Sequence, residues 1–505
     1  FEFFFTLRKL VECINSFSSA IRPNIVALQP MTRLFRFKRP IHHRRIWSAF
    51  PYTTSSRVGS SSGANSCDRL LWDHATVTCL PGLESVLSEE LRMLGIQHHA
   101  PPSSRKGKKT GQIRLQKISA SIDDLFRCCL YLGTASQVRL RCGSFSARGL
   151  AELKRKTASI PWNEIFSKDG IRNGCLDVRA VSSKSKLYHT GAIRDRVLQG
   201  IEKHFGLDDN NHYKKGKSKT QTSETVPTVL LDVHVYKDEV RIYVNAYPIP
   251  LHQRGYRQQV AKAPLREDLA YAMLLAAGWT PAWAIGQRTT IPEHENECHG
   301  LVDPFCGSGT IVIEGAAMKV GLPPGRLRDR SPFEGTLLED SQQWSKGVKR
   351  SVSAAITTKQ LEDGSPCSIS ASDRDSGALE ATRCNAERAG VLGALTIQNV
   401  PLSGQAWFKE PSQAPSSVVV VTNPPFGKRI SSKSSSTKLL PLYQSLNECV
   451  HRLAKEHGRR MCGVVLTDNP GLLSTTGASF PFKTSFKTFH GGLKVSAMKF
   501  DANGS

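Results

Sequence analysis

The sequence lacks the features of a membrane protein and of a disulfide-bonded or zinc-binding protein. No apolar run approaches the roughly 20 residues that span a bilayer, so we expect no membrane partner. The 13 cysteines contain no C-x-x-C pair, and Cys128 and Cys129 are merely adjacent. We interpret them as reduced thiols, typical of an intracellular compartment. His294, Cys298 and His299 lie close together without a further set of ligands, so we expect no metal site.

Acidic residues are absent from one stretch near the N-terminus. Between Met31, the first methionine, and Asp68 the chain contains no Asp or Glu, whereas arginine and serine are frequent. This composition is typical of an organelle transit peptide. Residues 1–67 are therefore predicted to be a disordered segment that targets the chain to a mitochondrion or a plastid. The alternative is a disordered basic arm on a cytoplasmic protein.

Positive charge is in excess along the rest of the chain as well. The 505 residues carry a net charge of +25, and the sequence pI is about 9.7. Residues 1–67 contain ten Lys/Arg and two Asp/Glu, so they account for only part of this excess. A strongly basic chain favours a polyanionic partner such as a nucleic acid.

Two regions with different patterns follow the basic segment. In residues 68–250, short strand-like and helix-like segments alternate without a long βαβ rhythm, which predicts an α+β module. Within it, "TVLLDVHVYKDEVRIYVNA" has the pattern of a hairpin that turns at Lys237 and Asp238. In residues 251–505, a helix is expected to begin at Pro264, which suits a first helical position.

Beyond that helix, strands alternate with helices, apart from an expected irregular insert at residues 322–366. The alternation predicts a doubly wound, mostly parallel sheet. Such sheets bind ligands beyond the carboxyl ends of their strands, where the strand order reverses. Asp303, Asp373 and Asn423 all fall at predicted strand ends, so we expect them to lie at one site.

The first of these strand ends leads into a glycine-rich loop. "LVDPFCGSGTIVIEGA" places Asp303 at the tip of the strand and Gly307 and Gly309 before a helix. Two glycines let a ligand approach the backbone closely, and the helix N-terminus favours a carboxylate. The loop has neither the G-x-G-x-x-G pattern nor the Gly-Lys-Ser/Thr of a phosphate loop. At the next strand end, Asp373 can accept both ribose hydroxyls of a nucleoside; the alternative is a helix N-cap before Ser376.

A third strand ends in two prolines. The four valines of "SVVVVTNPPFGKRI" predict a strand buried on both faces. The carbonyl groups of the Asn423 side chain and the Pro424 backbone can accept the N–H groups of an exocyclic amine on a base, which localises its lone pair. Phe426 can stack on a base rotated out of its helix, and Lys428 and Arg429 can hold flanking phosphates. A turn capped by asparagine explains the backbone but not the ring and the cations.

The ordered pair "DPFCGSGT" and "TNPPFGKR" resembles the motifs of class I S-adenosylmethionine-dependent amino-methyltransferases. More narrowly, the chain resembles RNA guanine-N2 methyltransferases that carry a THUMP domain. The blocks "PGLESVLSEEL", "ASDRDSGALEATRCNAERAGV" and "HGGLKV" extend this resemblance over about residues 68–500. The resemblance implies a THUMP/ferredoxin-like RNA-binding module at residues 68–250. It also implies a Rossmann-like methyltransferase domain at residues 251–505, with S-adenosyl-L-methionine as its cofactor.

The resemblance implies two sets of site residues. The expected cofactor-binding residues are Pro264, Leu265, Asp303, Cys306, Gly307, Gly309 and Asp373. The residues expected to hold the target amine are Asn423, Pro424, Pro425 and Phe426. The sequence departs from the family at two positions. In "TIQNVPLSG", Asn399 stands where many relatives carry an acidic residue that binds N6 of the cofactor's adenine. Phe426 stands where relatives often carry tyrosine.

A basic segment in the first module is a candidate RNA contact. "KSKLYHTGAIRDR" combines cations with an aromatic ring, which suits the end of an RNA strand. The predicted contacts are Lys184, Lys186, Tyr188 and Arg194, together with Lys428 and Arg429 of the second module. The alternative is a plain amphipathic helix.

The sequence thus predicts an enzyme that methylates N2 of a guanine, with large-subunit ribosomal RNA as the expected partner. A tRNA guanine-N2 methyltransferase of the same architecture is one alternative. A DNA adenine-N6 methyltransferase shares the Asn-Pro-Pro-aromatic chemistry but not the N-terminal module. A non-catalytic ribosome-assembly factor is a further alternative, against which the intact motifs argue.

Overall fold

In the computed structural model, every described residue lies in one compact unit within Ala64–Ser505. The described residues are 75–99, 111–114, 121–174, 176–207, 229–259, 264–285, 299–355, 368–426, 435–474 and 480–502. The predicted targeting segment and the cations Lys428 and Arg429 lie outside them. Within the described ranges, no helix has the length and apolar character needed to cross a membrane.

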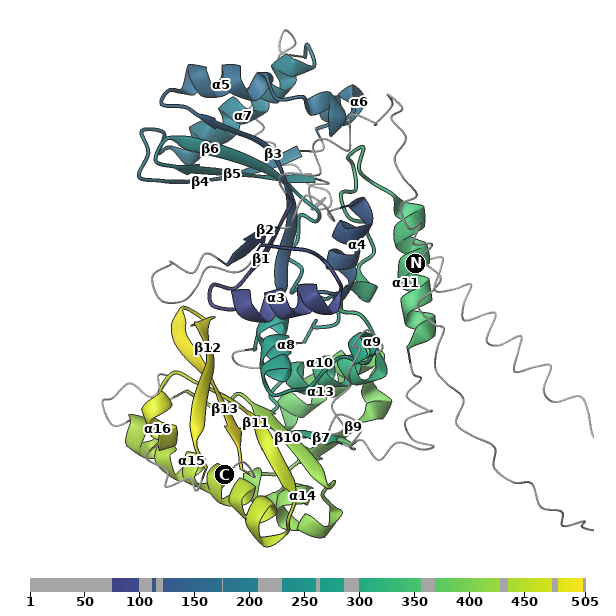
Figure 1. The fold of residues 1–505 in the computed structure, drawn as a ribbon, viewed down its shortest axis with the longest axis vertical. Helices are drawn as coiled ribbons and strands as arrows, with labels where there is room; N and C mark the ends of the chain where they lie inside the picture. The colour runs from purple at the N-terminus through teal and green to yellow at the C-terminus, as the bar shows by residue number, and fades with distance from the viewer. Residues whose placement is uncertain are drawn as a thin grey trace, which may run out of the picture. The chain divides into compact units, whose positions relative to one another are not determined.

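The first module contains a six-stranded sheet in the order β2–β1–β3–β6–β5–β4 (Figure 1). The strands are β1 (Ala75–Cys79), β2 (Gln112–Arg114), β3 (Ala135–Ser146), β4 (Leu176–Ser183), β5 (Val229–Tyr236) and β6 (Glu239–Asn245). All neighbours run antiparallel except β4 and β5. The 12-residue β3 pairs with β1 through its first half and with β6 through its second half, so one strand joins both halves of the sheet.

Helices cover this sheet in two groups. The helices are α3 (Glu84–Met93), α4 (Ile122–Tyr131), α5 (Leu150–Ala158), α6 (Lys168–Arg172) and α7 (Thr190–His204). Ser121 caps α4, because its hydroxyl accepts the amide hydrogen of Asp124 and the Asp124 carboxylate accepts that of Ser121.

The predicted hairpin turn is confirmed: Lys237 and Asp238 both have positive φ, 52° and 63°, as a two-residue turn requires.

The second module contains a seven-stranded sheet in the order β12–β13–β11–β10–β7–β8–β9. Its strands are β7 (His299–Asp303), β8 (Ile369–Asp373), β9 (Leu395–Asn399), β10 (Ser417–Thr422), β11 (Arg460–Thr467), β12 (Phe482–His490) and β13 (Leu493–Asp501). The five strands from β9 to β11 are parallel, whereas β13 and β12 add an antiparallel hairpin at one edge. The strand order reverses between β7 and β10, which confirms the predicted doubly wound sheet.

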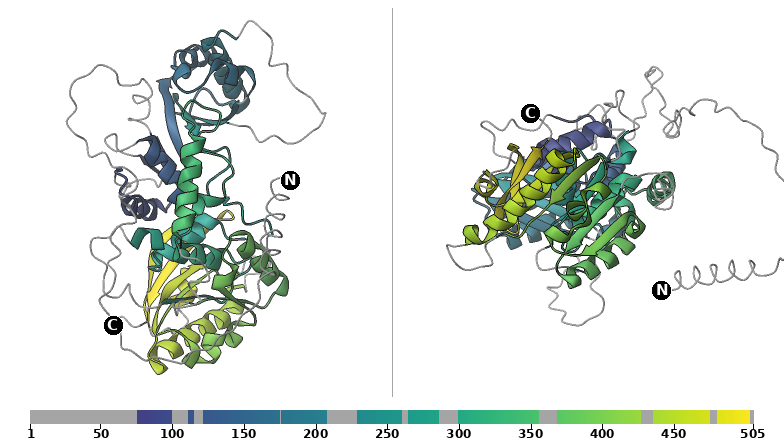
Figure 2. Two further views of the ribbon diagram at one scale, coloured as in Figure 1. Left: turned by 90° about the vertical axis from the view of Figure 1, so that its right-hand side faces the viewer. Right: turned by 90° about the horizontal axis from the view of Figure 1, so that it is seen from below.

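The valine strand β10 is buried on both faces, as predicted. Val419 and Val421 belong to the core that includes helices α8 and α10, whereas Val418 and Val420 belong to the core that includes α14 and α15. Figures 1 and 2 show α10 and α15 on opposite sides of this sheet. The helices of this module are α8 (Glu267–Ala276), α9 (Ala282–Ile285), α10 (Thr310–Val320), α11 (Ser341–Ala354), α13 (Ser376–Arg388), α14 (Ala406–Lys409), α15 (Ser435–His451) and α16 (Pro470–Ser474).

Two expectations about helices are wrong. Helix α8 begins at Glu267 rather than at Pro264, because Arg266 keeps an extended backbone and its guanidinium binds the Asp268 carboxylate at 2.6 Å. The insert expected to be irregular contains α11, capped by the side chain of Asp340. The buried ring of Trp344 in α11 packs edge-on against Phe126 of α4. The packing partner of α11 therefore comes from the other module.

Strand β12 is absent from the prediction. Its exposed positions alternate with buried ones only after an irregularity in register between Thr484 and Phe486. That bulge interrupts the period of two on which sequence reasoning depends. The missed strand is relevant to function, because it ends at His490 beside the site described below.

Arg254 joins the two modules at their buried contact. The residue is 2% exposed, and its guanidinium donates to the backbone carbonyl of Gly133, just before β3. The same guanidinium lies 3.6 Å from the carboxylate of Glu314 in α10, which also accepts the hydroxyl hydrogen of Tyr256 at 2.8 Å. At Gly133 an added Cβ would come within 2.3 Å of the Tyr271 ring of α8. The approach of the two modules therefore requires both the glycine and the buried cation.

We predict that Arg254→Met destabilises the chain by about 3–5 kcal/mol, because it leaves Glu314 buried without its cation. The matched control is Arg148→Met, since Arg148 pairs with Asp238 at 3.3 Å while its side chain is 70% exposed. An exposed pair of this kind contributes about 0–1 kcal/mol. Urea unfolding followed by circular dichroism measures both variants. Equal shifts of the two midpoints would contradict a special role for the buried pair.

Candidate active site at the carboxyl ends of the parallel strands

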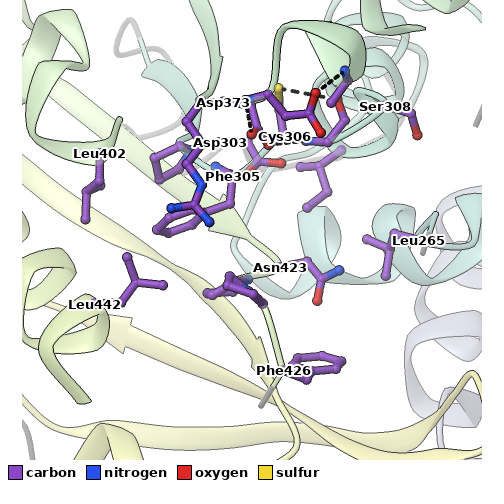
Figure 3. Close-up of a pocket in the computed structure, with 18 of the residues that line it drawn as sticks. Leu265, Asp303, Phe305, Cys306, Ser308, Asp373, Leu402, Asn423, Phe426 and Leu442 are labelled. Carbon is purple, nitrogen blue, oxygen red and sulfur yellow. Dashed lines mark hydrogen bonds between the residues drawn. The ribbon is translucent and has the colours of Figure 1, made fainter. Parts of the chain in front are cut away.

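A cavity of about 1080 Å³ opens at the carboxyl ends of β7, β8 and β10 (Figure 3). Its volume is slightly above the roughly 300–1,000 Å³ typical of ligand sites. The predicted site residues that line it are Pro264, Leu265, Asp303, Cys306, Gly307, Asp373, Asn423, Pro424, Pro425 and Phe426. The tertiary structure thus brings together residues from four separate stretches of the sequence. Gly309 is not among the lining residues.

Three side chains hold the glycine-rich loop in place. The Asp373 carboxylate accepts the amide hydrogen of Gly307 at 3.0 Å, and the Thr382 hydroxyl donates to the Gly307 carbonyl at 2.8 Å. The buried Asn385 amide donates to the Ser308 carbonyl at 3.2 Å. Both Thr382 and Asn385 come from α13. The conformation of the loop is therefore held by hydrogen bonds from within the chain.

Gly309 acts behind the cavity wall rather than in it. Its φ of 81° is a left-handed conformation at the N-cap of α10, and an added Cβ would come within 2.6 Å of the Thr382 methyl group. Gly307 also has positive φ, 54°, but the space around its Cα is open. Gly307 thus leaves room on the ligand side, and Gly309 allows the close packing of α10 against α13.

Asp303 connects the strand ends β7 and β10. Its carboxylate accepts the Thr422 hydroxyl hydrogen at 2.7 Å and the Phe305 amide hydrogen at 3.1 Å. Burial is the largest cause that raises the pKa of Asp303 to about 7; the nearby Asp373 acts in the same direction, and the two hydrogen bonds act against it. Part of the Asp303 population is therefore protonated at neutral pH. Because Thr422 directly precedes Asn423, this bond also positions the Asn-Pro-Pro turn.

The alternative of an N-cap is wrong for Asp373. Asp375 caps α13, accepting the amide hydrogens of Gly377 and Ala378. The Asp373 carboxylate instead lies in the cavity wall beside the glycine loop (Figure 3). Asn399, the residue expected where relatives carry an acid, donates its amide hydrogen to the Asp373 backbone carbonyl at 3.0 Å and is not among the lining residues.

Cys306 is a packing residue of the wall. Burial raises the pKa of its thiol well above the usual range, and the carboxylates of Asp303 and Asp373 add to the effect. The thiol is therefore neutral at physiological pH and is no nucleophile. It fills the corner between the two acidic strand ends.

Asn423 lines the cavity and has an unpaired acceptor in its side chain. Its Oδ1 is buried and has no hydrogen-bond partner among the described residues. In Figure 3, Asn423 lies between Asp303 and Phe426. A buried polar atom without a partner carries a cost of about 1–3 kcal/mol, so its presence in a wall points to a ligand donor.

Phe426 lies at the outer side of the same turn. Its ring meets the His490 ring nearly edge-on, with centroids 6.4 Å apart. His490, Gly491 and Leu493 of the β12–β13 hairpin also line the cavity. Sequence reasoning missed them, although "HGGLKV" carried a signal in its paired glycines.

The predicted RNA contacts of the first module lie away from this cavity wall. Lys184, Lys186 and Arg194 are exposed, and Tyr188 is 69% exposed with its ring 4.1 Å from that of His189. Arg194 also pairs with Asp177 at 3.3 Å. None of these four lines the cavity. Within the described part of the chain, no group of three His, Cys, Asp or Glu side chains is arranged to hold a metal ion.

Two stretches of the chain match known domain families. Residues 293–492 match the RMKL-like methyltransferase domain, and residues 74–139 match the RlmL ferredoxin-like domain. The chain therefore carries a ferredoxin-like domain followed by a methyltransferase domain. This confirms the predicted resemblance and fold class, while the THUMP assignment stays a prediction.

Similar curated proteins share one name. A "Ribosomal RNA large subunit methyltransferase K/L" of Legionella pneumophila (strain Corby) is 29% identical over 79% of this chain and 49% of its own length. The protein of that name from Syntrophotalea carbinolica is 29% identical over 84% of this chain and 53% of its own length. The chain thus spans about half the length of the curated relatives it matches.

Solved structures share the fold. A putative methyltransferase, SMU.472, crystallised in complex with SAH, superposes with a TM-score of 0.64 at 23% identity, covering 85% of this chain and 97% of that one. A possible methylase from Clostridium difficile 630 superposes with a TM-score of 0.63 at 22% identity, with the same coverage of both chains. The architecture is that of class I methyltransferases.

We predict that Asp373→Ala weakens S-adenosylmethionine binding by about 1.5–3 kcal/mol, since charge-assisted hydrogen bonds are lost. Asp373→Asn should lose less, because its amide oxygen can still accept the Gly307 amide hydrogen. The control is Asp340→Ala, which removes the N-cap of α11 and lowers stability by about 1 kcal/mol without touching the cavity. Isothermal titration calorimetry measures binding. Unchanged affinity in folded Asp373→Ala would remove Asp373 from the cofactor site.

We predict that S-adenosylmethionine affinity rises as the pH increases from 6 to 8. A cationic ligand favours the ionised Asp303, whose pKa is raised from 3.8 to about 7 in the folded chain. Because the folded state holds this proton more tightly than the unfolded state, the same group lowers the free energy of unfolding as the pH rises from about 4 to about 7, and this loss levels off above the folded pKa. Calorimetry on wild type and Asp303→Asn tests both effects. A pH dependence of affinity that persists in Asp303→Asn would assign it to another group.

Proposed function

We propose that this chain, which carries an RMKL-like methyltransferase domain behind an RlmL ferredoxin-like domain, methylates the exocyclic N2 amine of a guanine in large-subunit ribosomal RNA. The cofactor is S-adenosyl-L-methionine. The observation that carries the proposal is the buried, unpaired Oδ1 of Asn423 in the cavity wall. The name shared by the curated relatives supports ribosomal RNA as the substrate.

The glycine-rich loop and its neighbours fit the cofactor. Gly307 leaves open space on the cavity side, and the N-terminus of the 11-residue α10 favours the carboxylate of a methionine moiety. Asp373 would accept the ribose hydroxyls, and Pro264 and Leu265 would flank the cofactor. When bound, the cofactor supplies an electrophilic methyl group on a positively charged sulfur.

The Asn-Pro-Pro turn would prepare the nucleophile. The lone pair of an exocyclic amine is delocalised into the base, which makes the nitrogen a poor nucleophile. Asn423 Oδ1 and the Pro424 carbonyl would accept the two amine hydrogens and hold the lone pair toward the methyl carbon. With its lone pair held in this way, the amine nitrogen would accept the methyl group in exchange for a proton, which would leave to water.

Phe426 would hold the target base after it has left its helix. Its ring lies near Asn423 in the cavity lining (Figure 3), where it can stack on a base. A phenylalanine supplies stacking without the hydroxyl contact of the tyrosine found in relatives. Pro425 keeps the turn rigid between the two contact residues.

The first module would provide most of the RNA affinity. Lys184, Lys186 and Arg194 can bind phosphates, and the exposed Tyr188 can stack on an unpaired base. The overall excess of positive charge supports the same partner. The targeting of the chain by residues 1–67 to a mitochondrion or plastid is likewise a proposal.

We predict that Asn423→Ala lowers kcat by about 10²–10³-fold, about 2.7–4 kcal/mol, as for loss of one preorganised polar contact. RNA and cofactor binding should change much less. The assay incubates wild type and variant with labelled S-adenosylmethionine and unmodified ribosomal RNA, then digests the RNA and separates its nucleosides.

A parallel reaction with transfer RNA decides between the two RNA classes. Label in N2-methylguanosine supports the target atom, whereas label in N6-methyladenosine would overturn the guanine assignment. Methylation of RNA by Asn423→Ala at the wild-type rate would contradict the proposed role of the unpaired oxygen.

A further inference from the structure

Two residues that line the cavity carry a buried polar side-chain atom without a partner. These atoms are Oδ1 of Asn423 and Nδ1 of His490, and neither is paired by any residue that the structure describes. In the proposed function, Oδ1 of Asn423 accepts a hydrogen of the target amine. The second has no role in the reaction as derived above, yet a buried nitrogen without a partner is as costly as a buried oxygen.

The position of His490 is set by the edge hairpin. It is the last residue of β12, and Gly491 and Gly492 follow with φ of 54° and 79°, so the chain reverses directly after it. His490 is paired in register with Leu493, which also lines the cavity. The tight turn therefore holds the imidazole against the cavity.

The His490 imidazole belongs to the cavity lining and lies beside Phe426. Its ring lies edge-on to Phe426, with an interplanar angle of 77°. Phe426 and Asn423 belong to one turn, so the unpaired nitrogen and the unpaired oxygen belong to residues that line one cavity from two elements. A planar base in contact with Phe426 presents its polar edge to both.

We propose that His490 is a base-positioning residue whose Nδ1 accepts the N1–H of the target guanine. This inference rests on the proposed function. On the Watson–Crick edge of guanine, N1–H lies next to the N2 amine, so both hydrogen bonds come from neighbouring atoms of one edge. Adenine has an unprotonated N1 and offers no such donor, so the contact would favour guanine.

The charged groups around His490 favour the neutral imidazole, which can accept a hydrogen bond at Nδ1. Burial lowers the pKa of His490, and the cations Arg266 and Arg257 lower it further, against the raising effect of Asp268. A neutral imidazole with its proton on Nε2 has a free lone pair on Nδ1. A charged imidazole would instead place a second donor opposite N1–H.

The test is a cycle of two substitutions, one in the enzyme and one in the RNA. The probe is a ribosomal RNA fragment that contains the methylated guanine, made with either guanine or 2-aminopurine at that position. 2-Aminopurine keeps the amine that receives the methyl group but lacks N1–H. Wild type should methylate the guanine fragment with a kcat/KM about tenfold or more above that for 2-aminopurine, as for one lost hydrogen bond.

The expected result is a coupling between the two substitutions. His490→Phe should lower kcat/KM for the guanine fragment about tenfold and leave that for the 2-aminopurine fragment nearly unchanged. His490→Asn should restore part of the preference, because its Oδ1 stands at the same number of bonds from Cβ as Nδ1. The control His457→Phe changes an exposed histidine after α15 and should preserve the preference. Affinity for S-adenosylmethionine should be equal in all variants.

Two outcomes would overturn the inference, and they are distinguishable. Equal losses on both fragments in His490→Phe would show a structural role for the ring, while the proposed function stands. Absence of N2-methylguanosine with the wild-type enzyme would overturn the proposed function and this inference together.

Discussion

The parallel pairing of β8, β7 and β10 is the constraint on which the site depends. Parallel strands in register bring their carboxyl ends to one edge, and here they place Asp373, Asp303 and Asn423 around one cavity. The hydrogen bond from Thr422 to Asp303 then ties the cofactor side of the cavity to the amine side. A shift of either strand would separate these two halves of the chemistry.

The remaining structure supports this edge from two directions. Helix α13 holds the glycine loop through hydrogen bonds from Thr382 and Asn385. From the other side, Arg254 connects the carbonyl of Gly133 with Glu314 on the helix that begins at that loop. The proposed RNA-binding module is thus linked through Arg254 to α10, the helix whose N-terminus would bind the cofactor.

The cavity wall has two parts, which differ in whether their polar side-chain atoms are hydrogen-bonded within the chain. Around Asp303 and Asp373 the polar groups are largely satisfied by the chain itself, which suits a cofactor site that keeps its shape between turnovers. Around Asn423 and His490 acceptors are left open, at a cost that a bound base would offset. A polar group without a partner is tolerated where a substrate completes it, and the distribution of these atoms supports the proposed position of the substrate edge.

Local sequence patterns were sufficient to predict the fold class and the strand ends at which the site residues lie. The valine run predicted a strand buried on both faces, and strand-end residues predicted a shared site, because these follow from side-chain period and parallel topology. Helix α11 and strand β12 escaped prediction, since Trp344 is stabilised by Phe126 of the other module and a bulge breaks the period of β12. The roles of Thr382 and Asn385 in holding the loop, and the place of His490 beside Phe426, were decided only by tertiary packing. Contacts between residues far apart in the chain leave no periodic trace in the sequence, so only the folded structure reveals them.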